Sequence, residues 1–422
     1  MLVRAVHSYN QNGANAIHLF ELPNPLCLQL IMFCNRHSLY DSSPGPIMRK
    51  TSSPISNQTV ARFRLKRHHF LDSAPTNAVT ICCDICGAQA QVMSSAYLQL
   101  WARNHALTRA DIEDALWKTR TLIKTSLMRQ TLHIIPTDEF QMYIAAVKPC
   151  RLAGALRIMA KFGIEREEAD SLTALIMKAL SEGPLRRAAI HAAIRPKVSK
   201  RVHAWMERVW SILRLPVAEG MICYGSGENK EVAFIRTDHW LPDLKLKSIP
   251  AVEAQCALFR KYLSAYGPAT AADFAHWAGI SMPEARQIPP LLEPELAEVS
   301  VENRKCFLPA KDVSVLNKAA PAKSCVRLLP SFDTYLLAHR EKDHLLGAKH
   351  YKRVYRNQAW ISPAVLIDGE IAGVWSHKLQ SRKLVVEIEP FIKLSRAIRS
   401  EIELEAEHLA NYFQSSLECR FV

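Results

Sequence analysis

The sequence predicts a mainly α-helical protein with β hairpins (α+β), in which three tandem winged-helix units precede a β-rich C-terminal domain with a closing helix. Two observations predict this class. The order helix, turn, helix, hairpin recurs between residues 48 and 318, and after residue 319 the hydrophobic pattern takes the period of strands. With 422 residues, 49% hydrophobic and 22% charged, the chain has the composition of a globular protein with several domains.

Residues 1–47 differ from the rest of the chain. They are rich in Asn, Ser and Pro, lack a helical or strand period, and end in a stretch of Ser, Pro and Gly just before Met48. We expect a poorly ordered extension, with Met48 as the functional start of the protein and the upstream Met as a misassigned start codon. An ordered N-terminal arm is the alternative.

The first predicted unit covers residues 48–147. Thr108 and Asp111 have the spacing of a capping box, which marks the start of a helix. The expected elements are helices at 56–70, 92–101 and from 108, short strands at 122–127 and 130–135, and a helix that restarts at 136–138.

The second and third units, 148–245 and 246–318, repeat this plan. A Gly-Pro pair stands between the first and second helix of each, at Gly183 and at Gly267. The expected helices are 167–180, 185–194 and 199–213, then 252–266, 270–278 and 282–292; the expected strands are 215–224, 231–236, 296–301 and 305–308.

The last domain covers residues 319–422 and begins with the linker 319–323. Asp368-Gly369 between two apolar runs is a strong signal of a hairpin turn. The expected strands are 327–329, 364–367, 371–375 and 384–388, and the closing helix is 395–413.

The charge of the chain indicates a polyanionic partner. Lys and Arg number 54 against 40 Asp and Glu, so 54 − 40 gives a formal net charge of +14. Basic residues are concentrated in 148–214, where Lys200 and Arg201 open a predicted helix, and in 339–356, where tyrosines are interspersed. On helix-turn-helix units such charge favours contact with DNA phosphates, and solvated helix faces are the alternative.

Several classes of protein are excluded. No apolar stretch approaches the ~18 residues of a membrane span, and the eleven Cys lack the spacing of a disulfide framework. Cys83 and Cys86 form a C-x₂-C without a second ligand pair at zinc spacing, so we expect no metal, and no cofactor. Motifs for nucleotide hydrolysis, zinc deamination and serine hydrolysis are missing.

Gln89 and Gln91 stand in the segment Gly-Ala-Gln-Ala-Gln-Val-Met. On a regular helix their side chains would point about 200° apart, so they converge only at a helix start or in an extended segment. Without further context, two surface glutamines would be the ordinary interpretation.

The context of this segment is a set of motifs in a fixed order. The stretches 87–91, 97–103, 127–133, 267–277, 328–336 and 368–375 resemble the winged-helix crosslink-repair DNA glycosylase family (AlkZ/YcaQ-like), and the likeness covers about residues 55–415.

The resemblance implies that Gln89 and Gln91 are the catalytic pair, in the branch that has Gln rather than Asp at the second position. An N7-alkylated purine is cationic and already a good leaving group, so little general acid is needed. An amide can hold a water below C1′ and stabilise the developing positive charge, although it is a weak base. Substrates with neutral leaving groups should therefore be poor.

Five further residues are candidates for DNA contact, and three of them have an alternative interpretation. Arg129, Thr131 and His133 would share one face of a strand beside the first hairpin and could line the same channel; a structural histidine is the alternative for His133. For Asp333 and Trp375, scaffold positions in the β domain are the alternative.

We therefore expect a monofunctional DNA glycosylase that hydrolyses the N-glycosidic bond of N7-alkylated purines, including interstrand crosslinks, in base excision repair. Its partner would be double-stranded DNA with alkylated purines or crosslinks, and the protein would be a cytoplasmic monomer, associated with the nucleoid when bound to DNA. A non-catalytic winged-helix DNA-binding protein or regulator is the main alternative, and an interaction scaffold is a third.

Overall fold

The structure, a computed structural model, describes residues 49–50, 54–71, 76–208, 212–226, 232–245, 248–318 and 324–422. The chain divides into two units, Met1–Pro46 and Ile47–Val422, and every described residue belongs to the second. The predicted extension 1–47 and the predicted linker 319–323 lie outside the described residues.

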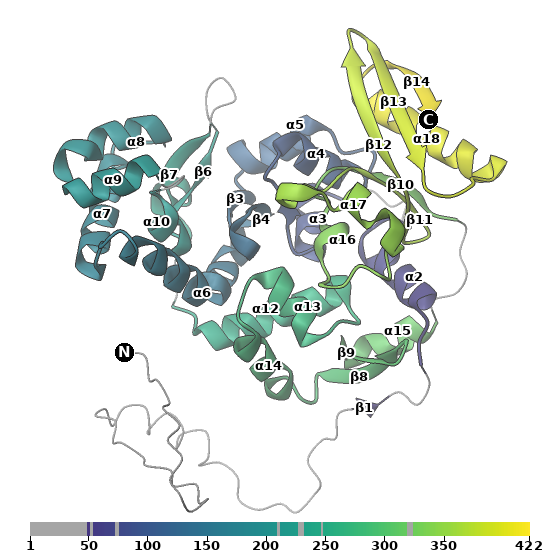
Figure 1. The fold of residues 1–422 in the computed structure, drawn as a ribbon, viewed down its shortest axis with the longest axis horizontal. Helices are drawn as coiled ribbons and strands as arrows, with labels where there is room; N and C mark the ends of the chain where they lie inside the picture. Colours follow the sequence, from purple (N-terminus) through teal and green to yellow (C-terminus); the bar gives the residue numbers. More distant parts are fainter. Residues whose placement is uncertain are drawn as a thin grey trace, which may run out of the picture. The chain divides into compact units, whose positions relative to one another are not determined.

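The first group of helices and strands (Figure 1) includes residues 87–93 with Gln89 and Gln91, called the Gln segment below. The Ser56 hydroxyl caps the first helix by accepting from the Thr59 backbone N–H at 3.2 Å, and Thr108 forms the expected capping box with Asp111. The elements are α2 (Asn57–Arg67), α3 (Ala78–Asp84), β2 (Ala88–Gln89), α4 (Met93–Trp101), α5 (Arg109–Glu113), a π-helical turn (Asp114–Lys118), β3 (Leu122–Ser126), a 3₁₀ turn (Met128–Gln130), β4 (Leu132–Pro136), a second 3₁₀ turn (Thr137–Glu139) and α6 (Phe140–Ala160).

The next elements correct one prediction. The expected strand 215–224 begins as a helix, because Leu215, Val217 and Ala218 form a buried helical turn, and Pro216 lies in its first turn, where no N–H is needed. The elements are α7 (Arg166–Ala179), β5 (Leu185–Arg186), α8 (Arg187–Ile194), a 3₁₀ turn (Arg195–Lys197), α9 (Lys200–Arg208), α10 (Arg214–Ala218), β6 (Ile222–Gly225), β7 (Ala233–Arg236) and α11 (Thr237–Trp240).

The third group follows the predicted order of helices and hairpin. Thr270 with Asp273 and Ser281 with Glu284 form capping boxes at the starts of two helices. The elements are α12 (Ala251–Tyr266), α13 (Ala271–Ala278), α14 (Met282–Leu291), β8 (Leu296–Val301), β9 (Arg304–Pro309), a 3₁₀ turn (Ala310–Asp312) and α15 (Val313–Asn317).

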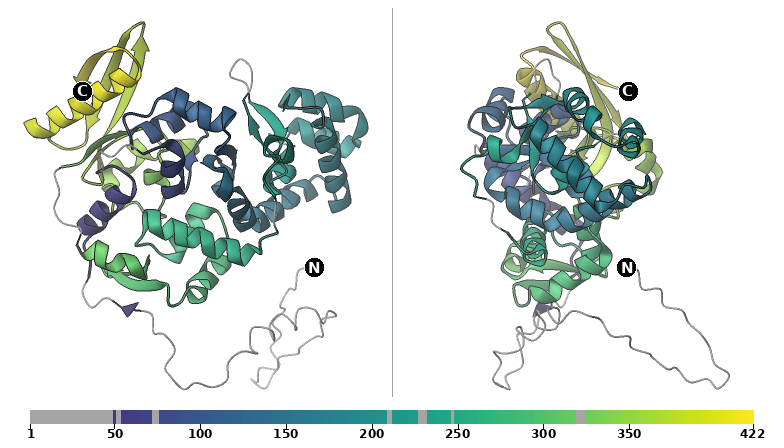
Figure 2. Two further views of the ribbon diagram at one scale, coloured as in Figure 1. Left: turned by 180° about the vertical axis from the view of Figure 1, so that it is seen from behind. Right: turned by 90° about the vertical axis from the view of Figure 1, so that its left-hand side faces the viewer.

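The C-terminal part forms a five-stranded sheet in the order β10-β11-β12-β13-β14, with α18 against it, visible at the yellow end of the chain in Figure 2. Asp368 and Gly369 both have positive φ, 51° and 96°, as the predicted tight hairpin requires. The elements are β10 (Val326–Leu329), α16 (Thr334–Leu337), α17 (Tyr351–Val354), β11 (Ala364–Ile367), β12 (Glu370–Gln380), β13 (Lys383–Pro390), α18 (Arg396–Tyr412) and β14 (Ser416–Phe421), with 3₁₀ turns at Ala348–His350 and Asn357–Ala359.

The first two hairpins share one sheet, which has the order β2-β4-β3-β6-β7-β5. They meet where Lys124 of β3 pairs with Tyr224 of β6. The third hairpin, β8-β9, forms a separate sheet with β1 (Arg49–Lys50). The described chain is thus a mixed α/β structure, and the boundaries of the four predicted domains stay predictions.

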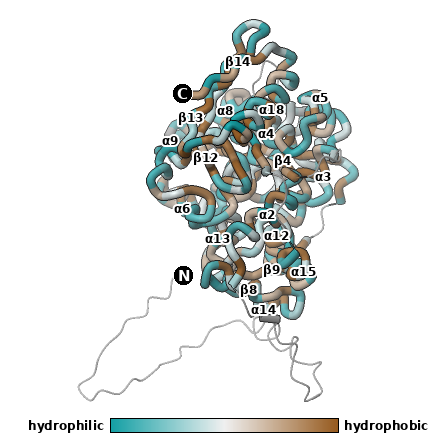
Figure 3. The backbone as a smooth tube through the Cα atoms, turned by 90° about the vertical axis from the view of Figure 1, so that its right-hand side faces the viewer, coloured by the Kyte–Doolittle hydropathy of each residue, from teal (hydrophilic) through white to brown (hydrophobic). Residues whose placement is uncertain are grey.

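The largest hydrophobic core lies between α6, α12 and α13. Its aromatic rings are in close contact; the centroids of Phe259 and Phe274 are 4.9 Å apart, and those of Tyr262 and Trp277 are 5.0 Å apart. Along the helices in Figure 3, hydrophobic and hydrophilic segments alternate over short distances, as amphipathic helices on a core require.

Two further observations concern the described residues alone. None of their helices is both long and apolar enough to cross a bilayer. Their cysteines are all free thiols, and Cys82 and Cys86 of the C-x₂-C region are buried.

Candidate active site

Gln89 is held in place from three sides. It lies in β2, directly opposite His133 of β4, and its side chain is buried, with 4% of the residue exposed. Its Oε1 accepts a hydrogen bond from Arg129 Nη2 at 3.0 Å, and its backbone carbonyl accepts from Gln99 Nε2 at 2.8 Å. The amide of Gln89 is therefore fixed by its neighbours.

Arg129 connects the Gln segment to α13. It lies in the turn between β3 and β4 with a left-handed φ of 52°, and its Nη1 donates to the carbonyl of Trp277 at 2.6 Å. That carbonyl belongs to the last turn of α13, where the helix dipole favours a cation. Burial lowers the pKa of Arg129 to about 10, so the guanidinium stays charged at neutral pH.

Gly279, the C-cap of α13, makes this contact sterically feasible. It has a φ of 76°, and a Cβ at this position would lie 2.8 Å from the Arg129 backbone N. Only a glycine both adopts this conformation readily and allows so close an approach.

His133 is a buried, neutral histidine. Its Nδ1 donates to the Thr131 carbonyl at 3.0 Å, and 1% of the residue is exposed. Burial, and then the charge of Arg129, lower the pKa of His133 to about 3. The structural interpretation of His133, left open by the sequence, fits these contacts.

The predicted common strand face of residues 129, 131 and 133 is not present. β4 begins only at Leu132, because the chain turns sharply through Met128–Gln130, and the Thr131 hydroxyl closes this turn by donating to the Met128 carbonyl at 3.0 Å. Arg129 nevertheless reaches Gln89 through its long side chain.

Gln91, in contrast, is exposed. It follows β2 and precedes α4, and its Oε1 makes one long contact, 3.4 Å, with the Leu132 backbone N–H. Gln91 lines a cavity of about 390 Å³ whose other walls come from β3, β4, α6, α10 and the β6-β7 hairpin. The other lining residues are Ser126, Gln130, Leu132, Arg151, Ala155, Arg187, Leu213, Arg214, Val217, Ala218, Tyr224, Val232 and Phe234.

Three cations in and beside this cavity, Lys124, Arg151 and Arg214, have no carboxylate partner among the described residues. Arg151 donates to the carbonyl and, at 3.1 Å, the hydroxyl of Ser126, and Arg214 donates to Gln130 Oε1 at 3.1 Å. Lys124 is 5% exposed, with its Nζ 5.9 Å from the centroid of the Tyr224 ring. Burial lowers the pKa of Lys124 to about 8 and that of Arg151 to about 10, so both are mainly protonated at neutral pH.

This arrangement suits an anion. A buried positive charge is costly unless it is paired, and neutral acceptors compensate for it only in part. Phosphate oxygens would supply the missing negative charge beside Gln91.

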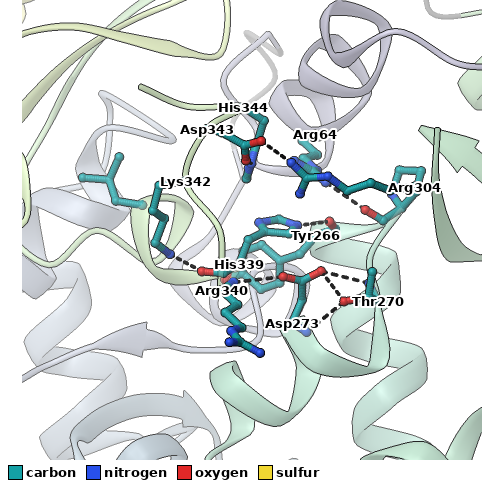
Figure 4. Close-up of polar contacts among 12 residues, drawn as sticks. Arg64, Tyr266, Thr270, Asp273, Arg304, His339, Arg340, Lys342, Asp343 and His344 are labelled. Atoms are coloured by element: carbon teal, nitrogen blue, oxygen red, sulfur yellow. Dashed lines mark hydrogen bonds and ion pairs between the residues drawn. The ribbon is translucent and has the colours of Figure 1, made fainter. Parts of the chain in front are cut away.

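The opposite end of α13 is also fixed (Figure 4). The Asp273 carboxylate accepts from the Thr270 hydroxyl at 2.7 Å and, through its second oxygen, from the Arg340 backbone N–H at 2.9 Å. His339 Nε2 donates to the Tyr266 carbonyl at 3.0 Å, and Lys342 Nζ donates to the His339 carbonyl. Helix α13 is therefore anchored by the Arg340 backbone at one end and by Arg129 at the other.

Asp333 and Trp375 lie in the interior. The Asp333 carboxylate binds both terminal nitrogens of Arg103, at 2.8 and 2.9 Å, and also caps α16. Trp375 Nε1 donates to the Leu329 carbonyl at 2.8 Å. These contacts fit the scaffold alternative for both residues.

Lys200 and Arg201 are exposed at the start of α9, and Arg201 lies 3.3 Å from Glu168. Neither lines the Gln91 cavity. Their predicted contact with DNA stays a prediction.

Sequence reasoning missed the cations at the cavity. Lys124 offered a signal, because a lysine in the short predicted strand 122–127 is unusual beside Leu122 and Ile123. Arg151 and Arg214 offered none, since each is one of many basic residues in 148–214 and only the tertiary fold selects them.

Comparisons with known proteins agree on one family. Residues 84–412 match the family model described as "DNA glycosylase AlkZ-like". The chain is 30% identical over 360 residues to an interstrand DNA cross-link repair glycosylase of Streptomyces sahachiroi. The aligned region covers 83% of this chain and 95% of that protein. The solved structure of Streptomyces sahachiroi DNA glycosylase AlkZ superposes with a TM-score of 0.78 at 28% identity, over 88% of this chain and 100% of that one.

Proposed function

The chain belongs to the AlkZ-like DNA glycosylase family, and from this premise we propose that it is a monofunctional glycosylase for N7-alkylated purines in duplex DNA, including interstrand crosslinks. In this proposal it acts as a monomer built from three winged-helix units and a β-rich domain, and starts base excision repair.

One observation carries the proposal for the site. Gln91 is exposed at a cavity beside cations that have no described acidic partner, while Gln89 is buried and held by Arg129. We assign Gln91 to the reacting sugar and water, Lys124, Arg151 and Arg214 to neighbouring phosphates, and Gln89 to positioning through Arg129.

The chemistry requires little from the protein. The bond between C1′ and the purine N9 breaks, and its electron pair neutralises the cationic base as it leaves. Water forms the new bond to C1′ and releases its proton to solvent. The Gln91 carboxamide oxygen accepts a hydrogen bond from that water and places negative potential near the sugar as positive charge develops.

The protonation state of His133 fits the roles proposed for Gln89 and Gln91. His133 is neutral and already donates to a backbone carbonyl, so it is a poor general acid. A cationic leaving group does not need one. A neutral leaving group does need a general acid, and no carboxylic acid or histidine is among the residues that line the cavity of Gln91.

The test is a direct assay on modified DNA. Wild-type protein incubated with a duplex containing one N7-methylguanine should produce an alkali-labile abasic site, and no cleavage should occur on the unmodified duplex. A uracil duplex is the matched neutral substrate and should stay intact. If the protein binds all three duplexes and yields no abasic site, it is a non-catalytic DNA-binding protein.

A further inference from the structure

Two histidines and a glutamate from distant parts of the chain meet beside the C-terminal end of α4. His105 follows α4, whereas Glu405 and His408 lie one helical turn apart on α18. Each offers one ligand atom, and these atoms lie within 4.8 Å of one another. Among the described residues this is the one group of three or more His, Cys, Asp or Glu side chains so arranged.

The neighbours of the group hold its side chains in position. The His105 ring stacks on Trp101, with 4.7 Å between ring centroids, and lies 4.6 Å from the His408 ring. His105 Nε2 is 3.5 Å from Glu405 Oε1. Arg327 Nη1 donates to the same Glu405 oxygen at 3.2 Å, while Arg327 Nη2 donates to the Phe70 carbonyl at 2.6 Å.

Polar atoms of the group are left without a partner. Glu405 is 4% exposed, and its second oxygen, Oε2, is buried without a hydrogen-bond partner in the described protein. The same holds for His105 Nε2 and His408 Nδ1. Three buried atoms with lone pairs, gathered in one place, are costly unless something binds them.

A divalent metal ion would satisfy all three atoms. Zn²⁺ accepts imidazole nitrogen and carboxylate oxygen at about 2.0–2.2 Å, and three protein ligands with one open position are a common set. The i, i+3 spacing places Glu405 and His408 on one face of α18, so a small rotation of the imidazoles would close the group around an ion. Arg327 would orient the carboxylate through Oε1, as outer-shell partners of metal ligands do.

The open position has access to solvent. His105 and His408 line a cavity of about 630 Å³ together with Tyr97, Thr108 and Tyr412. A water molecule can therefore complete the coordination.

We propose that His105, Glu405 and His408 bind one Zn²⁺ ion, with water as the fourth ligand. The ion ties α18 to the residues that follow α4. Because α4 begins two residues after Gln91, this link holds the far end of the helix that follows the Gln segment. Binding of the ion does not depend on the proposed glycosylase activity.

The first test is metal binding by the full chain. After treatment with a chelator and dialysis, Zn²⁺ titration followed by calorimetry should show one equivalent bound with micromolar or tighter affinity. At a hundredfold excess over Kd the melting temperature should rise by roughly 3 °C. Absence of Zn²⁺ binding would overturn the proposal and leave only the contact between His105 and Glu405.

The second test assigns the ligands. Glu405→Gln and His408→Gln should each weaken Zn²⁺ binding at least 100-fold, whereas His239→Gln, at an exposed histidine of α11, should not change it. Unchanged binding in the two ligand variants would contradict the assignment. The absorption spectrum of Co²⁺ bound to the wild-type protein is a readout that needs no variant. A thiolate charge-transfer band in that spectrum would place the metal at cysteines and would also overturn the proposal.

Discussion

At the scale of single residues, the two glutamines of one short motif have different environments. Gln89 points into the protein and accepts from Arg129, whereas Gln91 reaches a cavity and has a single long contact. The reason is local: β2 ends at Gln89, and the chain bends before α4 begins at Met93. One glutamine is thus part of the interior and the other is available to a ligand.

These environments predict that substitutions at Gln89 and Gln91 change stability by different amounts. Gln89→Leu should cost about 1–3 kcal/mol, because it leaves Arg129 Nη2 buried without its acceptor. Gln91→Leu should stay within about 0.5 kcal/mol, as exposed substitutions usually do. Urea denaturation of both variants measures this, and equal costs would contradict the two environments.

His133 predicts a pH dependence. Its pKa is about 3 in the folded chain and about 6.5 when unfolded, so below pH 6.5 only the unfolded chain takes up the proton. Its contribution to stability is full above pH 6.5 and falls as the pH drops towards 3. Between pH 7 and pH 5 the loss is about 2 kcal/mol.

The comparison that isolates this residue uses His133→Asn, which cannot titrate. The wild-type protein should lose about 2 kcal/mol more stability than the variant between pH 7 and pH 5. Parallel stability curves for the two proteins would show that His133 is accessible to protons in the folded state.

At the scale of elements, the Gln segment is positioned by the end of another helix. Arg129 lies between Gln89 and the Trp277 carbonyl of α13, and α13 is anchored at its other end by the Arg340 backbone. The position of Gln89 therefore depends on α13, which lies almost two hundred residues further along the chain.

Gly279 tests this dependence. Gly279→Ala would place a Cβ 2.8 Å from the Arg129 backbone, in addition to the cost of a left-handed alanine. Gly163 has a similar φ of 70°, but its nearest atom would be 3.8 Å away, so Gly163→Ala carries the conformational cost of about 1 kcal/mol alone. Gly279→Ala should cost at least about 1 kcal/mol more and should also slow base excision.

Thermal unfolding and excision rates of the two variants decide this prediction. If Gly279→Ala behaves like Gly163→Ala in both measurements, the contact between α13 and the Arg129 turn does not position Gln89.

Most elements could be predicted because their signals are local. Capping residues, Gly-Pro turns and the Asp368-Gly369 pair mark helices and hairpins within a few residues. The apolar run from Leu215 led to the wrong prediction of a strand, because hydrophobic periodicity does not distinguish a short buried strand from a helical turn.

The candidate site could be predicted only in part. The motif supplied Gln89 and Gln91, yet their different burial, the meeting of Lys124 with Tyr224, and the cluster of His105 with Glu405 all arise from contacts between remote segments. No period or spacing in the sequence encodes such contacts.

At the scale of the whole molecule, the positions of the cations decide which part of the net charge of +14 is available to a polyanion. Arg151 and Arg214 line the cavity of Gln91, and Lys124 lies beside it against Tyr224. These three cations have no acidic partner among the described residues, whereas Arg166 on α7 pairs with Asp170 at 2.9 Å. Lys124, Arg151 and Arg214 therefore have positive charge available for phosphates, whereas the charge of Arg166 is balanced by Asp170.

This distribution predicts the salt dependence of DNA binding. If about six phosphates are contacted, affinity for undamaged duplex should fall about 10³-fold between 50 and 200 mM salt. Arg214→Gln should lower the slope by about one, and Arg166→Gln should leave it unchanged. Fluorescence anisotropy at several salt concentrations measures both slopes, and a flat dependence for the wild-type protein would contradict the electrostatic account.

The central claim, that Gln91 acts on the sugar of an alkylated nucleotide, is tested most directly by single-turnover excision of N7-methylguanine from a duplex. The wild-type protein and Gln380→Ala, a variant of an exposed glutamine on β12, should excise at the same rate. Gln91→Ala should be slower by roughly 10- to 1,000-fold, with duplex affinity and melting temperature unchanged, because only the dipole that holds the water is lost. Full excision by Gln91→Ala would contradict the claim.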